Sequence, residues 1–291
     1  MAKKKILLLS DDLRMSSGVG TMSREFVMGT LEHFDWVQIG GAIKHPDNGK
    51  YIDMNEAVRK DTGINDAYLK IIPVSGYGTP ELLRHIMATE KPDAILHYTD
   101  PRFWEWLYNM EHEIRMNIPI FYYNIWDDLP YPIWNEPFYE SCDLIMNISK
   151  QTVNIVDNVR KNVPTNEWNN TYVPHGINEK NFYPVRKGHK EYGDLISLRR
   201  TVTGGRDYDF IVFWNNRNIR RKLPGDVIMA FKTFCDMLPE SKGKKCALVM
   251  HTQPKDPNGT DLPAVVDAVC PDYDVIFSTK KLDDKNLCYL Y

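Results

Sequence analysis

The chain has 291 residues, a length that fits one large domain or two medium ones. Hydrophobic residues make up 43% and charged residues 26%, which is ordinary for a soluble globular protein. The formal net charge of −3 gives no overall attraction to nucleic acid or to an anionic membrane, although it is compatible with a local basic groove.

The cysteines are scattered and include no CxxC pair, which predicts reduced thiols rather than a disulfide framework or a zinc site. The apolar run 6–9 behind the basic N-terminus is too short for the core of a secretory signal. No stretch approaches the roughly 20 apolar residues that span a bilayer. We therefore expect a cytoplasmic protein without a membrane span.

Short apolar runs alternate with helical patterns, as expected for βαβ units with a parallel sheet. In the first part of the chain we predict strands at 6–9, 36–39, 69–74, 93–97, 118–124, 142–147 and 170–173. Helices are predicted at 24–34, 79–89, 103–116 and 150–162. Thr79 is a suitable N-cap for its helix, with Pro80 at the first helical position.

A polar, basic stretch over 187–207 predicts a boundary between an acceptor-side domain, 1–190, and a nucleotide-sugar-binding domain, 191–291. The second domain has predicted strands at 210–214, 245–251 and 273–278, with helices at 224–238, 262–269 and from 282 onward. A doubly wound nucleotide domain has about five or six strands. We therefore expect the second domain to be truncated, or to be completed by a missing segment or a second chain.

Polar residues follow the predicted strands of the first domain. The loop 16–21 contains Gly18, Val19 and Gly20, and a glycine turn before a helix lets backbone N–H groups approach a phosphate. His97 and Asp100 follow another strand, at the sheet edge where open α/β sheets bind ligands. The structural alternatives are a tight βα turn for the loop and helix capping for Asp100.

Two further loops of the first domain carry polar groups. Asp127 and Asp128 follow the strand 118–124, and paired carboxylates there can orient sugar hydroxyls; a metal site and a solvated loop are the alternatives. A Pro-His-Gly turn contains His175 and Gly176 and exposes an imidazole and the backbone. An ordinary structural turn explains it equally well.

A basic loop follows the first strand of the second domain. Arg217, Arg220, Arg221 and Lys222 lie just before a helix predicted to begin near Pro224. Cations beside a helix N-terminus form a pyrophosphate-binding arrangement, with a solvated loop as the alternative. Together the strand-end motifs predict a cleft between two domains, lined from both sides.

This pattern resembles the family 4 retaining glycosyltransferases, or glycosyl transferases group 1, over residues 5–291. The most specific segments are Val173–Ile177 with Phe182–Pro184, and Phe213–Lys222. They are similar to the family's "PHG(V/I)…F.P" turn and its "GR…RK" loop. The resemblance implies an α/β, GT-B-like fold of two Rossmann-type parallel-sheet domains, the second truncated.

The resemblance also implies roles for residues. Arg217 and Lys222 would grip the diphosphate of a nucleotide-sugar donor, most simply a UDP-sugar, and stabilise the leaving group without a metal. Gly18, Val19 and Gly20 would close on the donor, and His175 and Gly176 would line the donor site. Asp100 would lie near the acceptor and the transferred sugar.

The chain departs from the family in three places. Thr99 stands where the family often has a histidine, and Asn178 replaces a common aspartate. The family's downstream "E…FG…E" segment, which holds the donor's ribose and sugar, has no counterpart. The resemblance therefore does not extend to a histidine-assisted step at Thr99 or to the segment that completes the family's donor site.

Overall similarity to transferases of T4-like bacteriophages, and the aromatic-rich region 103–134, favour hydroxymethylated cytosine in DNA as acceptor, in a host cytoplasm. Arg160, Lys161 and the stretch 186–190 would then contact the DNA backbone. The net charge argues mildly against DNA. Polysaccharide or lipid acceptors, a non-catalytic nucleotide-sugar or partner-binding module, and a nucleotide-sugar epimerase are the alternatives.

Overall fold

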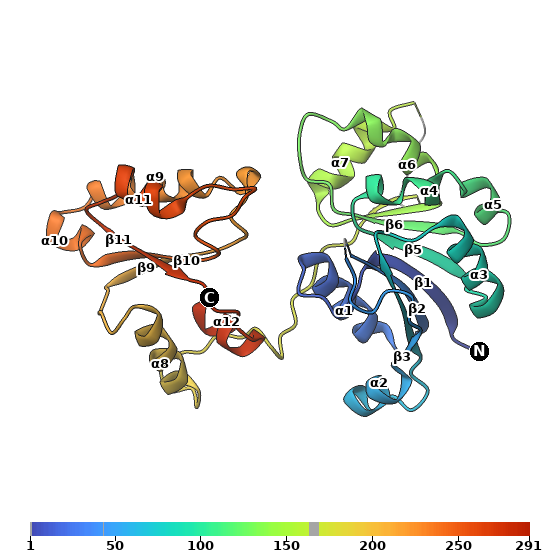
Figure 1. Ribbon diagram of the computed structural model, residues 1–291, viewed down its shortest axis with the longest axis horizontal. Coiled ribbons are helices and arrows are strands. Elements are labelled where there is room, and N and C mark those ends of the chain that lie inside the picture. Colours follow the sequence, from blue (N-terminus) through green and yellow to red (C-terminus); the bar gives the residue numbers. More distant parts are fainter. Residues whose placement is uncertain (1, 43, 163–168) are drawn as a thin grey trace. The chain divides into compact units, whose positions relative to one another are not determined.

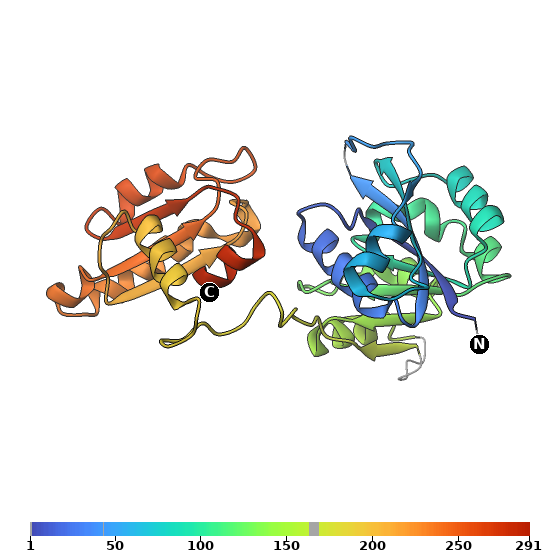
Figure 2. The same ribbon diagram turned by 90° about the horizontal axis from the view of Figure 1, so that it is seen from below.

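The computed structural model describes residues 2–42, 44–162 and 169–291 (Figures 1 and 2). The chain divides into two compact units, Met1–Gly176 and Ile177–Tyr291. The sequence places the boundary later, at 190–191. The intervening segment packs on the second unit, because the Tyr183 hydroxyl donates to Glu191 (2.5 Å) and the Cys288 thiol donates to the Tyr183 carbonyl (3.4 Å).

The first unit is built on an eight-stranded sheet in the order β3-β4-β2-β1-β5-β6-β7-β8, parallel except for the β3–β4 pair. Its strands are β1 (Lys4–Asp11), β2 (Phe34–Ala42), β3 (Ile52–Asp53), β4 (Leu69–Ser75), β5 (Ala94–Tyr98), β6 (Ile120–Asn124), β7 (Leu144–Asn147) and β8 (Asn170–Tyr172). Because most strands run parallel, their carboxyl ends meet along one edge.

Helices cover both faces of this sheet. They are α1 (Gly18–Thr30), α2 (Asn55–Thr62), α3 (Pro80–Glu90), α4 (Glu105–Tyr108), α5 (Glu111–Arg115), α6 (Glu136–Glu140) and α7 (Lys150–Val159), with 3₁₀ turns η1 (Pro101–Trp104) and η2 (Ile133–Asn135). Strand β1 shows why two layers form: Ile6 and Leu8 pack toward α1 and α2, whereas Leu7 and Leu9 pack toward α3 and α7. A strand buried on both faces is apolar throughout.

The second unit has a three-stranded parallel sheet in the order β11-β10-β9. Its elements are α8 (Tyr192–Val202), β9 (Phe210–Asn215), η3 (Arg220–Lys222), α9 (Pro224–Asp236), α10 (Glu240–Gly243), β10 (Cys246–His251), α11 (Leu262–Val269), β11 (Asp274–Ser278) and α12 (Asp284–Leu290). Helices α9 and α11 pack on one face, around a core that includes Phe231, Leu248 and Met250. Figure 1 shows α8 and α12 on the other side of the sheet.

The structure confirms the α/β class with two successive parallel-sheet units. Thr79 caps α3 as predicted, accepting a hydrogen bond from the Leu82 backbone N–H (3.3 Å). The predicted helix 103–116 is wrong in detail, because the chain forms η1, α4 and α5 there instead of one helix. The polar, basic stretch 187–207, where the sequence analysis places the domain boundary, contains α8. All five cysteines are free and buried.

Candidate functional site

The glycine loop ends directly in helix α1. Ser17 is the N-cap: its hydroxyl accepts a hydrogen bond from the Gly20 backbone N–H (2.9 Å) and donates one to a carboxylate oxygen of Asp11 (2.8 Å). Added Cβ atoms distinguish the two glycines. At Gly20 the Cβ would lie 2.8 Å from the Asp12 and Met15 carbonyl oxygens, whereas at Gly18 it meets nothing within 4 Å.

The adjacent Asp12 is a structural anchor for the same loop. Its fully buried carboxylate accepts hydrogen bonds from the Arg14 guanidinium (2.7 and 3.0 Å) and lies 3.0 Å from His45 Nε2. Burial alone would raise the pKa of Asp12, but hydrogen bonds and charge from Arg14, with the charge of His45, bring it below its usual value. Asp12 therefore stays ionised and holds in place the segment that follows β1 in the chain.

Asp100 lies at the carboxyl end of β5 and is already engaged. Its carboxylate accepts a hydrogen bond from the Arg102 backbone N–H (3.0 Å), which caps η1, and pairs with the Arg102 guanidinium through both oxygens. Burial raises its pKa, but these contacts with Arg102 outweigh burial and lower it. The structural role considered for Asp100 is thus present, and any substrate contact uses an ionised, arginine-paired carboxylate.

His97 is enclosed in the core rather than open to substrate. It is fully buried, its Nδ1 lies 2.6 Å from the Tyr108 hydroxyl, and its ring stacks on Tyr122 at 5.1 Å. Burial lowers its pKa to about 3, so the imidazole is neutral near pH 7. This histidine supports the sheet edge and presents no charge there.

An aromatic surface borders Asp100. The Arg102 guanidinium lies 5.5 Å from the ring centre of Trp126, a cation–π distance. Asp127 and Asp128 follow on an exposed loop; their backbone carbonyls accept hydrogen bonds from Gln151 and the Trp126 indole (both 3.1 Å). In the part of the chain that the structure describes, no group of three or more His, Cys, Asp and Glu side chains is placed to hold a metal.

His175 is attached to the first unit. Its Nε2 lies 3.3 Å from the Tyr98 hydroxyl, and its ring meets Tyr98 and Tyr123 edge-on. Burial lowers its pKa, so the neutral imidazole is favoured. Gly176, the last residue of this unit, has nothing within 4 Å of an added Cβ. The Pro-His-Gly turn therefore places a neutral ring beside two tyrosines at the carboxyl ends of β5 and β6.

In the second unit, the basic loop follows β9. Arg217 donates from Nε to Asp256 (3.0 Å) and its side chain is 64% exposed, so most of its donors face solvent. Lys222 ends η3, and α9 begins two residues later at Pro224, after Leu223 in the left-handed conformation. Among the described residues, Lys222 makes no ion pair. This arrangement offers two cations and a helix N-terminus to an anion.

A buried asparagine holds the basic loop in place. The Asn218 amide donates to the Gln253, Pro254 and Thr260 carbonyls (3.2, 3.2 and 2.7 Å) and accepts from the Thr260 N–H (3.2 Å). The amide thus ties the loop after β9 to the loop after β10. At the end of β10, His251 Nδ1 lies 2.9 Å from the Ser278 hydroxyl of β11. Sequence reasoning passed over Asn218, whose burial has no local signature.

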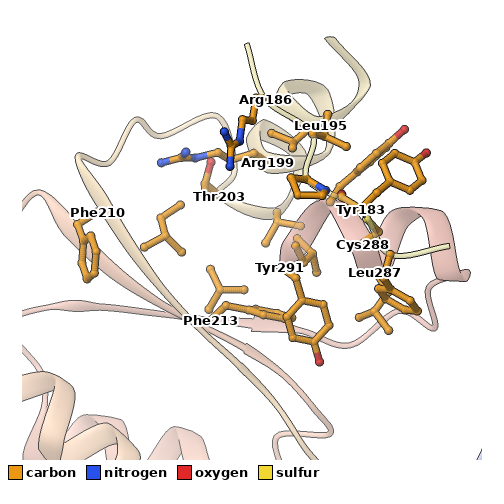
Figure 3. A pocket seen from close by; sticks show the side chains of 18 of the residues that line it. Tyr183, Arg186, Leu195, Arg199, Thr203, Phe210, Phe213, Leu287, Cys288 and Tyr291 are labelled. Atoms are coloured by element: carbon orange, nitrogen blue, oxygen red, sulfur yellow. Dashed lines mark hydrogen bonds between the residues drawn. The ribbon is translucent and has the colours of Figure 1, made fainter. Parts of the chain in front are cut away.

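A large cavity of the second unit lies away from the basic loop. It has a volume of about 1210 Å³ and lies beside β9, between α8 and α12. Figure 3 shows Phe213, Leu287 and Tyr291 along its apolar side and Arg186 and Arg199 at its rim. Neither Arg217 nor Lys222 lines it. The cavity marks a weakly covered face of the sheet rather than the predicted phosphate site.

The overall fold can be compared with solved structures, whereas no protein-family model and no curated protein matches the chain. It is similar to the E. coli trehalose-6-phosphate structure bound with UDP-2-fluoro glucose (TM-score 0.62, 12% identity, 98% of this chain and 75% of that one). The Burkholderia xenovorans α,α-trehalose-phosphate synthase (UDP-forming) in complex with glucose-6-phosphate has a TM-score of 0.61 and 9% identity, covering 98% of this chain and 76% of that one.

The UDP-GlcNAc 2-epimerase of Neisseria meningitidis bound to UDP-GlcNAc gives a TM-score of 0.52 and 11% identity, covering 99% of this chain and 75% of that one. The chain has a GT-B-like fold. Identities this low establish the fold alone. No described helix is both long enough and apolar enough to cross a bilayer.

The predicted site residues fall into two groups. Gly18, Val19, Gly20, Asp100, His175 and Gly176 belong to the first unit, and Arg217 and Lys222 to the second. Within each unit they gather at the carboxyl ends of the strands. Sequence reasoning missed Asp11. Like Asp100, it lies at the carboxyl end of a parallel strand, and this position is the signal that singled out Asp100.

Proposed function

We propose that the chain transfers a sugar, with retention of configuration, from a nucleotide-sugar donor to a hydroxyl acceptor. The observation that carries the proposal is the basic loop of the second unit. There Arg217 and Lys222 lie in the loop between β9 and α9 of a GT-B-like fold, with Lys222 two residues before the helix begins. Two of the similar structures contain UDP-sugars, which supports a UDP-sugar as the donor here.

The proposed reaction breaks the bond between the anomeric carbon and the diphosphate oxygen. The acceptor oxygen forms its bond to the same face of that carbon, and its proton passes to the departing diphosphate. Negative charge grows on the diphosphate as the bond breaks, and Arg217 and Lys222 would stabilise it. Loss of one such contact costs about 10²–10³ in rate. We expect Arg217 and Lys222 to fill this role without a metal.

In the first unit, Gly18, Val19 and Gly20 would lie against the donor, and His175 and Gly176 would complete that surface. Asp100, paired with Arg102, would face the transferred sugar or the acceptor. For the acceptor we propose hydroxymethylated cytosine in DNA, in a phage-infected cytoplasm. The half-buried Trp126 and the exposed Trp134 beside it support this choice, because accessible aromatic rings stack on unpaired bases.

The test is release of nucleoside diphosphate from a panel of UDP-sugars, with and without hydroxymethylated DNA. Arg217→Ala should lower release by at least about a hundredfold. Arg206→Ala is the matched control, because Arg206 is also exposed (58%) and paired with one aspartate, but lies before β9 at the other end of the sheet. Equal rates for the two variants would contradict the assignment of Arg217.

A nucleotide-sugar epimerase is the second candidate, favoured by the similarity to the UDP-GlcNAc 2-epimerase. It would convert the donor sugar without any acceptor. Chromatography of the sugar recovered from an acceptor-free reaction separates the two functions. Donor binding without release or conversion would instead indicate a non-catalytic binding module.

A further inference from the structure

A carboxylate that the proposed function does not use lies at the centre of the first unit's sheet edge. Asp11 is the last residue of β1, and its register partner is Gly41 in β2; the preceding Ser10 pairs with Tyr98 in β5. Asp11 therefore stands between β2 and β5, above the middle of the sheet. This is the edge where open α/β sheets bind ligands.

Asp11 differs from the other carboxylates at this edge because no cation is paired with it among the described residues. The Arg14 guanidinium is committed to Asp12 and Asp47, and Arg102 to Asp100. Within the described part of the chain, the carboxylate of Asp11 accepts a side-chain hydrogen bond from Ser17 alone, through one oxygen; Ser10 and Gln38 donate to the Asp11 backbone carbonyl instead. The second carboxylate oxygen remains available to a ligand donor.

The surroundings of Asp11 also set it apart electrostatically. Burial raises its pKa above the usual value, and the Ser17 hydrogen bond reduces this effect only in part. The pKa values of Asp12 and Asp100 are both lowered by their arginines. A carboxylate that is buried without a cation gains most from a hydrogen-bond donor and repels an anion.

An aromatic pair stands beside this carboxylate. The Tyr77 ring packs on Gly41, where an added Cβ would lie 2.6 Å from Tyr77 Cδ1. Burial is the main cause of the raised pKa of Tyr77, and the charges of Asp11 and Asp100 raise it further. The phenol therefore lies near both carboxylates. Phe103 stacks on Tyr77 (4.9 Å between ring centres, 8° between planes) and is 53% exposed.

We propose that Asp11 binds the reacting hydroxyl of the acceptor, and that this hydroxyl is carried by an uncharged ring whose flat face packs on Phe103. The hydroxyl donates to the free oxygen of Asp11, while Ser17 holds the other. A phosphate at the same position is disfavoured by the carboxylate. The proposal rests on the proposed function, because it takes this edge as the acceptor side, and it assigns hydroxyl recognition to Asp11 rather than to Asp100.

Two pairs of small probes test the proposal by calorimetric binding to the whole chain. Hydroxymethyldeoxycytidine and deoxycytidine differ by one hydroxymethyl group, and glucose and glucose-6-phosphate differ by a charge. The wild-type chain should prefer the hydroxylated nucleoside in the first pair or the neutral sugar in the second. The pair that responds tells whether a base or a sugar carries the hydroxyl.

Asp11→Asn should weaken the preferred probe by about tenfold or more and remove the preference, because the hydroxyl then donates to a neutral amide oxygen instead of a charged one. Phe103→Ala should weaken both members of the pair equally, and it is safe for folding because the ring is exposed. Asp61→Asn, an exposed aspartate on α2, is the matched control and should change nothing.

Several results would overturn the proposal: unchanged binding in Asp11→Asn, tighter binding of glucose-6-phosphate than of glucose, or no binding of either preferred probe. None of these depends on the donor. Failure of the proposed function would show instead as absent nucleoside diphosphate release, or as release insensitive to Arg217→Ala. The two failures are therefore distinguishable.

Discussion

Two glycines of the loop before α1 should respond in opposite ways to the same substitution. An alanine Cβ at Gly20 would lie 2.8 Å from two backbone carbonyl oxygens, those of Asp12 and Met15, and 3.1 Å from Ser17 Oγ. Carbon and oxygen atoms pack at about 3.5 Å, so the loop must shift. At Gly18 the added methyl group meets nothing within 4 Å.

The expected magnitudes follow from these contacts. Overpacking costs about 1–3 kcal/mol, and the upper part of this range applies to Gly20→Ala because the obstacles are backbone atoms. Replacing a helical glycine with alanine returns about 0.5–1 kcal/mol. Gly20→Ala should therefore lower the free energy of unfolding of the first unit by about 1–2 kcal/mol. Gly18→Ala should leave it unchanged or raise it by up to about 1 kcal/mol.

The assay is urea unfolding followed by far-UV circular dichroism and tryptophan fluorescence, fitted with separate transitions for the two units. The same variants then enter the nucleoside diphosphate assay. If the loop lies against substrate, Gly18→Ala should lose about tenfold in kcat/KM without losing stability, because its methyl group points into open space. Equal stabilities of the two variants would refute the reasoning from contacts, and full activity of Gly18→Ala would refute the ligand role of Gly18.

Two further predictions concern the carboxylates after β1. Asp12→Asn should destabilise the first unit by about 1.5–3 kcal/mol, because its charge-assisted hydrogen bonds to Arg14 are weakened in a buried position. Asp47→Asn, which neutralises the less buried partner of the same arginine, should cost less in the same urea titration. Since the pKa of Asp12 is lowered in the folded chain, this stabilisation is present above about pH 4 and is lost as the pH falls through the lowered value, which a pH series of urea midpoints will show. The pKa of Asp11 is shifted in the opposite direction, upward. An ordinary aspartate has a pKa of about 3.9, so binding of the preferred neutral probe should begin to weaken at a higher pH than this as the solution is acidified. Asp11→Asn should lack this acid limb, and a limb that persists in the variant would assign it to another group.

The strands were the most predictable part of the fold, because β1 and β10 are apolar runs that a sheet buried on both faces requires. Helix α8 was missed because its sequence is polar and none of its residues is fully buried, so it has no clear apolar stripe. The broken helix near Phe103 was missed because its apolar residues satisfy a helical spacing while Asp100 starts a 3₁₀ turn instead.

The positions of Asp100 and Arg217, each just after a strand, were predictable because strand ends alone decide them. Their partners were not, because Arg102 and Asp256 are chosen by side-chain geometry. The enclosure of His97 was also beyond the sequence, since a polar residue at a strand end is usually taken to face the ligand. Local pattern thus locates the edge, whereas packing decides which of its groups remain free.

Strand β9 has a practical consequence for work with this protein. Phe210–Asn215 is apolar on both sides of the strand, yet it pairs only with β10 in the described sheet and is fully or partly exposed along its length. Such an edge can template pairing between molecules. Self-association should therefore grow with protein concentration, and a lysine in place of the exposed Phe210 is a suitable solubilising change. Activity that falls as the enzyme is concentrated would then report pairing of edges and not a property of the active centre.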